Sequence, residues 1–419
     1  MTGLVLLLLY VALFVGSMVA VAFVTRNRTR KDFTALKTVT FGDESAVRPN
    51  RAASIISVLV IFLLWGAFTG SKWAPFHVPG PFVGESGFTY TAQDAAGQTD
   101  DAQVSFIVHP VGEDVAAPEP GAADGFAEDD TGTIGAYRTE LFRVTSNDGE
   151  GATVIAVDGQ EIAPGRTVDI ANGTVTMTPR GSLNVRPDTG FQMESIWLPA
   201  PEEVVGAFVD IWQNGYQNFT LIEHLGWSLI RVLVGFVLGA LVGIPLGYAM
   251  GLSGWFRGWF DPIVEFMRPV PPLALIPLVI IWFGIWETGK IVLLFLAALW
   301  IMAIAARAGV SGVNITKVHA AYSLGASKWQ ILRHVIIPNS LPEIFTGARV
   351  AMGVCWGTVV AAELVAAQKG AGMMIIAASK FQQTYIVLMG IILIGLIGYG
   401  IDILMRKAED VLVPWKGRS

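Results

Sequence analysis

The sequence contains little cysteine, histidine or charge for a chain of 419 residues. Its one cysteine, Cys355, excludes an intrachain disulfide, and its five histidines do not have the spacing of metal ligands. Charged residues make up 15% of the chain, whereas 53% of it is hydrophobic and the mean hydropathy is +0.55. No nucleophile elbow and no pair of catalytic carboxylates is present. We therefore expect a membrane protein with no catalytic residues and no metal site.

One segment has most of a nucleotide-binding motif, but its details exclude that function. Gly284–Lys290 matches most of a P-loop. The next residue, Ile291, stands where a Ser or Thr would bind magnesium, and no strand precedes the segment. We therefore expect that this chain is not an enzyme and binds no cofactor itself.

Long apolar segments account for the high hydropathy. A helix of about 20 apolar residues can cross the ~30 Å hydrocarbon core of a bilayer, because it satisfies its own backbone groups. The sequence predicts a mainly α, polytopic helical membrane protein with seven spans. These are 3–24, 53–70, 227–250, 263–285, 291–306, 344–366 and 385–405.

Basic residues flank these segments in a pattern that orients the chain. Cytoplasmic loops beside membrane spans carry an excess of Lys and Arg. All the basic clusters fall on one side only if the N-terminus is outside and the C-terminus inside the cytoplasm. The first span has no basic residues before it and is longer than a signal-peptide core, so we expect a retained anchor.

An acidic block separates the second and third predicted spans. Residues 75–200 hold 19 Asp and Glu, five Arg and no Lys, a net charge of −14. This charge predicts a translocated domain and excludes nucleic-acid binding, which needs a basic face. We predict two transmembrane helices with a short cytoplasmic loop in 1–72, a periplasmic β-rich domain in 73–200, and a five-span core in 201–419.

Turn signals within the acidic block indicate β-hairpins. Asn172-Gly173 joins two alternating segments, and Asp158-Gly159 joins another pair. Both dipeptides favour the two-residue turns of antiparallel hairpins. We expect a small β-sandwich or β-meander, which is either a docking module or a lid of no independent function.

The segment between the fifth and sixth spans carries the most specific motif. Residues 311–342 contain three basic residues and no acidic one, so we expect them in the cytoplasm. Their landmarks, His319-Ala320-Ala321, Gly325 and Pro338, have the spacing of the "EAA" loop of ABC-importer permeases, with His319 in place of the family's Glu. We expect two short helices, 316–324 and 328–335, broken at Gly325, because glycine tolerates a left-handed corner.

The resemblance implies that 311–342 is the coupling loop to a partner ATPase subunit, which holds the ATP and Mg. The residues that the resemblance and the composition assign to this contact are His319, Ala320, Ala321, Gly325, Lys328, Trp329, Arg333 and Pro338.

Other segments of the last half look like those of taurine and sulfonate permeases. They are 268–274, 281–284, 359–367 and 412–417. The resemblance implies a bacterial inner-membrane importer of taurine or a related small sulfonate. Nitrate, alkanesulfonate or thiamine-precursor transport is the alternative, because those permeases share much of these segments. An ion-gradient-driven secondary transporter would need an internal repeat, and none is seen.

The resemblance also implies partners. They are a second copy of the chain in a homodimer, two ATPase subunits, a periplasmic substrate-binding protein and membrane lipid. The additional N-terminal span and the periplasmic insert depart from the family pattern.

Prolines and polar residues inside the predicted spans mark a candidate translocation path. The prolines of the fourth span break its helix, and form either a path wall or gate or a structural kink. Two ionisable residues of the sixth span are ~21 Å apart along the helix and cannot pair with each other. The acidic one, Glu363, either lines the outer gate or pairs within the bundle. The candidate path residues are Pro269, Pro271, Pro272, Arg349, Trp356 and Glu363.

Overall fold

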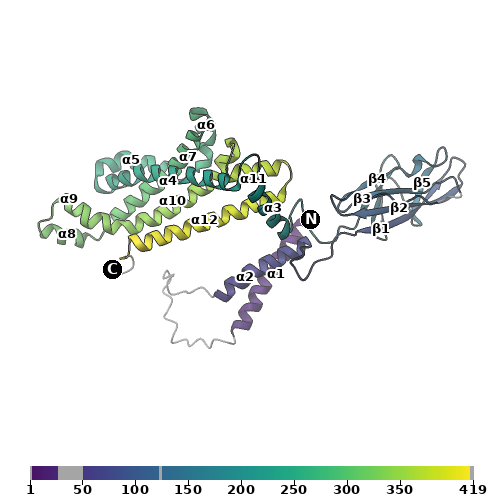
Figure 1. The fold of residues 1–419 in the computed structure, drawn as a ribbon, viewed down its shortest axis with the longest axis horizontal. Helices are drawn as coiled ribbons and strands as arrows, with labels where there is room; N and C mark the ends of the chain where they lie inside the picture. Colours follow the sequence, from purple (N-terminus) through teal and green to yellow (C-terminus); the bar gives the residue numbers. More distant parts are fainter. Residues whose placement is uncertain (1, 27–50, 122–124, 416–419) are drawn as a thin grey trace. The chain divides into compact units, whose positions relative to one another are not determined.

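The computed structural model describes residues 2–26, 51–121 and 125–415, and it is mainly helical (Figure 1). Residue contacts divide the chain into two units, Met1–Glu202 and Glu203–Ser419. The first unit contains α1 (Thr2–Arg26), α2 (Arg51–Thr69) and the strands. The predicted loop between its first two helices falls within 27–50, outside the described residues.

The strands of the first unit form two sheets. One sheet has the order β3-β2-β1-β5-β6, with β2 and β3 parallel, and the other has the antiparallel order β4-β9-β8-β7. The strands are β1 (Gly84–Gln93), β2 (Thr99–His109), β3 (Asp130–Gly135), β4 (Glu140–Phe142), β5 (Thr153–Val157), β6 (Gln160–Glu161), β7 (Thr167–Ile170), β8 (Gly173–Met177) and β9 (Leu183–Pro187).

Both sheets contribute to one hydrophobic core. Phe88 and Phe106 of the first sheet and Val175 and Leu183 of the second are buried in the same cluster. Burial alternates along β2 and β8, as expected for strands with one packed face. Strand pairing confirms both predicted hairpins. The turn between β5 and β6 is Asp158-Gly159 as predicted, whereas the turn between β7 and β8 is Ala171-Asn172, one residue before the predicted Asn172-Gly173. The unit is therefore a β-sandwich attached to two apolar helices.

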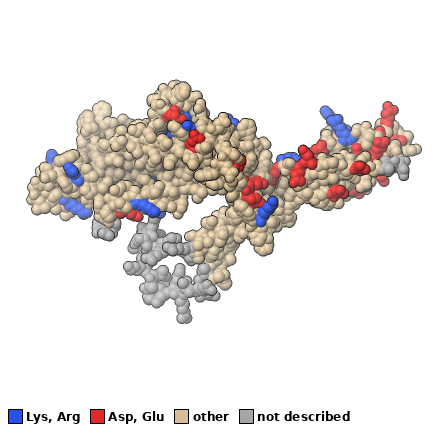
Figure 2. All heavy atoms as spheres, viewed as in Figure 1, with Lys and Arg blue, Asp and Glu red and all other residues tan. Residues whose placement is uncertain are grey.

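Acidic side chains are spread over the sandwich (Figure 2). Asp130 of β3 is half-buried, and its Oδ2 atom is buried without a hydrogen-bond partner among the described residues. Burial, together with the nearby charge of Asp148, raises the pKa of Asp130 to about 6. The Tyr90 hydroxyl donates to Asp148 Oδ1 at 2.9 Å, which fixes the neighbouring carboxylate.

The second unit is a helical bundle in which α7 packs against both α4 and α10. A capping box at Thr220 and Glu223 begins α4. The helices are α3 (Pro201–Asn214), α4 (Leu221–Leu252), α5 (Gly254–Met267), η3 (Pro272–Leu275), α6 (Ile276–Phe283), α7 (Glu287–Ser311), α8 (Ile315–Ser323), α9 (Lys328–Ile331), η4 (Leu332–Ile336), α10 (Ile337–Ala366), α11 (Ala371–Lys380) and α12 (Thr384–Leu412).

A glycine at every fourth position lets α4 approach α7 closely. A Cβ at Gly239 would lie 2.6 Å from Ala298 Cβ and 2.8 Å from the Phe295 carbonyl oxygen. Residues four apart lie on one helix face, so the series forms a single groove that receives α7. Its members are Gly235, Gly239, Gly243, Gly247 and Gly251.

The predicted fourth span, 263–285, has the helix break that its prolines indicated. The structure has two helical pieces there, Gly254–Met267 and Pro272–Phe283, which are bent by 93°. Pro269, Pro271 and Pro272 lie at the break, because proline lacks an N–H and disfavours helix in the preceding residue. The break therefore comes from the prolines that the sequence singled out.

Five helices of the described chain are long and apolar enough to cross a membrane, or six if the bent pair is one span. Residues Leu8–Val24 form a shorter apolar helix. The mainly helical, membrane-spanning character is thus clear, and the count of seven spans stays a prediction.

Candidate functional site

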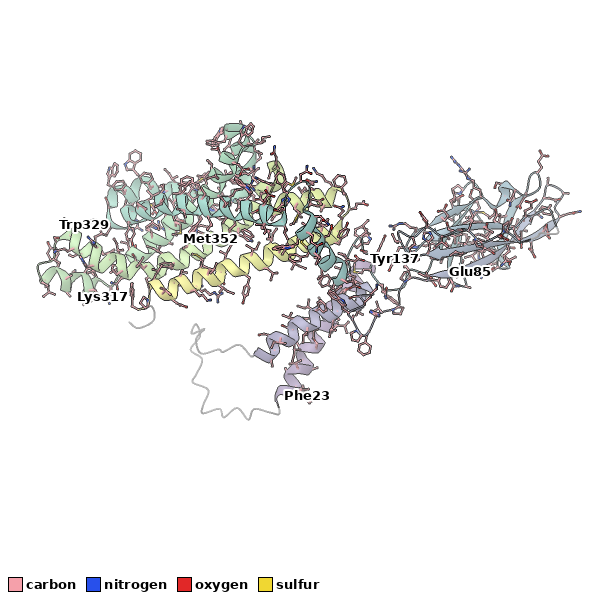
Figure 3. The ribbon with its side chains drawn as sticks, in the orientation of Figure 1. Phe23, Glu85, Tyr137, Lys317, Trp329 and Met352 are labelled. Carbon is pink, nitrogen blue, oxygen red and sulfur yellow. The ribbon has the colours of Figure 1, made fainter. Side chains whose placement is uncertain are left out.

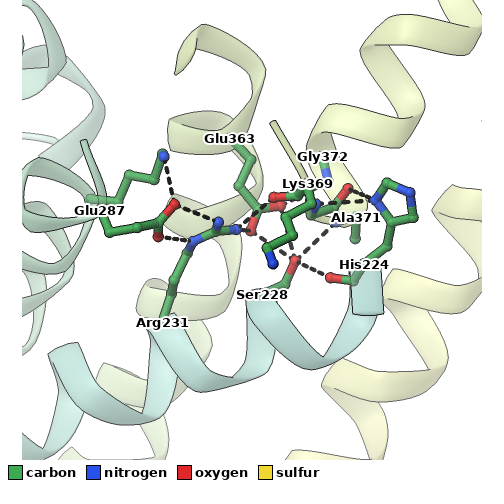
Figure 4. Close-up of polar contacts among 10 residues, drawn as sticks. His224, Ser228, Arg231, Glu287, Glu363, Lys369, Ala371 and Gly372 are labelled. Atoms are coloured by element: carbon green, nitrogen blue, oxygen red, sulfur yellow. Dashed lines mark hydrogen bonds and ion pairs between the residues drawn. The ribbon is translucent and has the colours of Figure 1, made fainter. Parts of the chain in front are cut away.

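A buried polar cluster connects the ends of four helices in the second unit (Figure 4). Arg231 lies in α4, Glu287 in the first turn of α7, Glu363 near the end of α10, and Gly372 in the first turn of α11. Arg231 and Glu363 are each 1% exposed. Buried charges are tolerated only where they are paired and hydrogen-bonded, and this cluster meets that condition.

Arg231 uses all three of its guanidinium nitrogens. Nε and Nη2 donate to the two carboxylate oxygens of Glu287, at 2.5 and 2.8 Å. Nη1 donates to Glu363 Oε1 at 2.7 Å and to the Lys369 carbonyl oxygen at 2.9 Å. Lys290 adds a second cation to Glu287, at 3.0 Å. The guanidinium is therefore a cross-link between α4, α7 and α10.

Glu363 is enclosed by donors from other helices. Ser228 Oγ lies 2.8 and 3.0 Å from its two carboxylate oxygens, and the Gly372 N–H donates to Oε2 at 2.9 Å. A Cβ at Gly370 would clash with this carboxylate, and the residue has a φ of +144°. Glycine is required at this position because the chain passes so close to the carboxylate.

His224 fixes the same corner through both ring nitrogens. Nδ1 accepts from the Gly370 N–H at 3.1 Å, and Nε2 lies 3.1 Å from the Tyr216 carbonyl oxygen. The second contact requires a proton on Nε2. The Lys369 ammonium lies over the Trp227 ring, 4.1 Å from its centroid. The cluster therefore pairs each guanidinium nitrogen of Arg231 and the carboxylates of Glu287 and Glu363 within the bundle.

The segment 311–342 folds as two short helices with a corner between them. Helix α8 ends at Ser323, and Gly325 has a φ of +81°. Ser327 begins α9 with a capping box to Gln330. After α9 the backbone passes through a π-turn, in which the Ile337 N–H donates to the Leu332 carbonyl oxygen five residues back. The glycine corner is confirmed. The second helix is shorter than the predicted 328–335, because α9 ends at Ile331 and the chain continues through the π-turn into α10.

Most residues of this loop that the motif singled out are exposed. Trp329 is 64% exposed, and Lys317 lies with it at the same end of the bundle (Figure 3). Leu324 at the corner is 88% exposed. His319, Ala320, Gly325, Lys328 and Arg333 are also exposed, whereas Ala321 and Pro338 are half-buried. The loop therefore presents exposed apolar and basic side chains, although Lys317 hydrogen-bonds to Asn339.

The predicted path residues are not brought together. Pro269 and Pro271 are exposed at the bend after α5. Arg349 forms an ion pair with Glu409 of α12. Trp356 is buried, and its indole N–H donates to the Ile394 carbonyl oxygen of α12 at 3.0 Å. In this conformation both side chains join α10 to α12.

Of the two alternatives for Glu363, the structure supports pairing within the bundle, with Arg231 as the partner. Sequence reasoning missed Arg231, Ser228 and His224. The available signal was an arginine inside an apolar run, which is costly unless it has a partner. It also missed the glycine series of α4, although the four-residue spacing is visible in the sequence.

Comparison with known proteins agrees with the geometry. A family model for the inner membrane component of binding-protein-dependent transport systems matches residues 221–410. The taurine transport system permease protein TauC of Escherichia coli (strain K12) is 46% identical over 223 residues, which are 53% of this chain and 81% of TauC.

Two further relatives belong to the same group. The putative aliphatic sulfonates transport permease protein SsuC of Escherichia coli (strain K12) is 40% identical, over 52% of this chain and 81% of SsuC. The nitrate import permease protein NrtB of Synechococcus elongatus is 30% identical, over 57% of this chain and 79% of NrtB. The resemblance stated from the coupling-loop motif is thereby confirmed. The chain belongs to the family of binding-protein-dependent transport system inner membrane components, the permease subunits of ABC importers, in which a separate subunit hydrolyses ATP.

Proposed function

We propose that this permease imports taurine or a related small sulfonate into the cytoplasm. The relatives named for taurine and aliphatic sulfonates support this cargo, and the share of TauC that the chain matches is large. The relative named for nitrate supports the alternative of another small anion. ATP and Mg would be held by the partner ATPase, since the described chain has no nucleotide-binding strand–loop–helix.

The observation that carries the mechanism is the exposed coupling loop. Its basic and apolar side chains, with Trp329 foremost, suit a groove on an ATPase subunit. The loop runs directly into α10, and Glu363 lies 25 residues beyond Pro338, or ~38 Å of helix. A push on the loop therefore reaches the polar cluster at the other end of α10. Opening and closing of that end would alternate access.

We propose a homodimer with two ATPase subunits and one periplasmic binding protein. Gly353 and Gly357 of α10 support the dimer, because a Cβ at either would meet no atom of this chain within 4 Å. Small residues of this kind permit close approach of a second helix in the membrane. Substrate affinity would reside in the binding protein.

Reconstitution tests the cargo. The permease, its ATPase subunits and the binding protein would be placed in proteoliposomes, and ATP hydrolysis measured with taurine, an alkanesulfonate or nitrate. Taurine should stimulate hydrolysis most at equal concentration. Stimulation by nitrate alone would replace taurine by the alternative cargo, and stimulation by an ion gradient without ATP would contradict the importer.

Site-specific labelling tests the proposed topology, with the N-terminus outside. The single native cysteine is buried, so a Cys355→Ser background leaves introduced cysteines as the labelling sites. A cysteine at Asn147 should react with an impermeant maleimide in spheroplasts, and one at Ser327 only after lysis. The reverse pattern would overturn the topology.

We propose that the β-sandwich lies outside the membrane and helps to seat the binding protein. Its negative charge suits electrostatic steering of the binding protein. Such steering is screened beyond a Debye length of ~8 Å at physiological salt. Deletion of 80–190 should weaken stimulation by the binding protein, most of all at low salt, while basal hydrolysis survives. Unchanged stimulation at every salt concentration would make the sandwich a bystander.

A further inference from the structure

The segment after α12 is bound to the first turn of α10 through Trp415. Trp415 Nε1–H donates to the Pro338 carbonyl oxygen at 3.1 Å. Two residues earlier, Val413 is buried. Glu409, in the last turn of α12, pairs with Arg349 of α10. The C-terminal end of α12 is therefore held to α10 by an ion pair and by the indole contact.

Pro342 explains why the Pro338 carbonyl is available. In a regular α-helix, the N–H of residue 342 donates to the carbonyl of residue 338. Proline has no N–H, so this bond cannot form. A backbone carbonyl without its helical partner seeks another donor, and the indole N–H, which can only donate, supplies one.

Pro338 is also the point where the coupling helices enter α10. The π-turn of η4 ends at Ile336, two residues before it. Asn339 accepts from Lys317 Nζ of α8 at 2.9 Å, and its side-chain amide donates to the Val335 carbonyl oxygen at 2.6 Å. Helix α8, the π-turn and the C-terminal segment thus converge on two consecutive residues. A displacement of α8 and α9 must move the atom that Trp415 holds.

We propose that Trp415 is a positioning residue that ties α12 to the coupling loop, so that loop movement reaches α12 as well as α10. The inference rests on the proposed coupling function of 311–342. The hydrogen bond acts as a mechanical link, and its loss uncouples α12 from the loop while the helices stay folded.

Three variants distinguish a link between α12 and the loop from a hydrogen bond that only satisfies the Pro338 carbonyl. Trp415→Phe keeps an aromatic ring and removes the N–H. Pro342→Ala restores a backbone donor to Pro338, and it is the matched control, because a carbonyl oxygen can accept two bonds. The third variant combines both changes. The readouts are solute moved per ATP in the reconstituted complex and the unfolding temperature of the permease.

Trp415→Phe should lower solute moved per ATP about two- to tenfold, the equilibrium factor that one hydrogen bond carries. Pro342→Ala keeps the indole link, so its ratio is the baseline against which the combined variant is compared. The combined variant should regain thermal stability but not the ratio. A wild-type ratio in Trp415→Phe, or a ratio restored in the combined variant, would show that the indole only satisfies the carbonyl.

Hydrogen exchange of the isolated permease tests the link without transport. Trp415→Phe should speed exchange of the amides in 332–342 by a similar factor, with α4 and α7 unchanged. Unaltered exchange there would refute the link itself. Failure of the proposed function would instead appear as a wild-type complex that solute does not stimulate, with the exchange effect still present.

Discussion

Replacing Gly239 of α4 by Ala should loosen the packing of α4 against α7, whereas the same change at Gly226 should not. A Cβ at Gly239 would lie 2.6 Å from Ala298 Cβ and 2.8 Å from the Phe295 carbonyl oxygen. A Cβ at Gly226 would meet no atom within 4 Å. Both glycines belong to the same helix, so both variants share the change in helix propensity.

The size of the destabilisation depends on whether the atoms beside the added Cβ can move away. Neither a backbone oxygen nor a Cβ can rotate away, so the two helix backbones must separate. Such overpacking costs about 1–3 kcal/mol, while Gly→Ala in a helix gains up to ~1 kcal/mol. The difference between the variants isolates the packing cost. At roughly 2–4 °C per kcal/mol for a domain of this size, their unfolding midpoints should differ by roughly 2–12 °C.

Thermal unfolding in one detergent, at one scan rate, measures this difference. Gly226→Ala should unfold at or above the wild-type temperature and Gly239→Ala below it. Adding Ala298→Gly to Gly239→Ala should recover part of the loss, because it removes the nearest of the close contacts. Equal midpoints for the two single variants would refute the role of the glycine series in close helix packing.

Single sites elsewhere give three further tests. Gly325→Val should lower solute moved per ATP several-fold, because a β-branched residue resists a φ of +81°. The control Gly325→Asn should have a smaller effect, because asparagine tolerates this backbone conformation. Normal coupling in the Val variant would contradict the role of the corner. Glu363→Ala should lower the free energy of unfolding by about 3–5 kcal/mol, since it leaves the charge of Arg231 buried without one partner. Glu287→Ala should lower it less, because the Glu287 side chain is 45% exposed. Equal shifts in unfolding midpoint would be inconsistent with this reasoning. The pKa of Asp130 is about 6 in the folded state and ~3.9 unfolded, so the folded state binds more protons and stability falls as pH rises from about 4 to 6. Asp130→Asn should therefore stabilise the sandwich by about 1 kcal/mol at pH 7.5, discounted for its half exposure, and hardly at pH 4, as calorimetry at both values would show.

Local signals in the sequence predicted much of the secondary structure. The glycine corner at Gly325 and the hairpin turn at Asp158-Gly159 both follow from backbone conformations that few residues adopt. The long apolar segments of the sequence predicted the positions of α2, α4, α7, α10 and α12. The prolines also predicted the helix break between α5 and α6. The 93° bend there could not be predicted, because hydropathy carries no information on the direction of a helix.

The polar cluster could not be predicted from spacing, because its members come from distant parts of the chain. Arg231 and Glu363 are separated by 132 residues, and nothing local to either one selects the other. A buried charge needs an oppositely charged partner, but several charged residues near the span ends were possible partners for each of them. The position of Gly370 near the carboxylate likewise depends on how α10 and α11 meet.

The two ends of α10 differ in a way that bears on how movement could pass along it. At its start, two prolines and a π-turn remove regular backbone hydrogen bonds, so this end can change shape at low cost. Beyond Pro342, the helix packs on α7 at Gly347, where an added Cβ would clash with Ala305, and it ends in the charged cross-link at Glu363. A close-packed segment of this kind transmits displacement and does not absorb it. Deformation should therefore concentrate in residues 332–342, and the remainder of α10 should move together with α7.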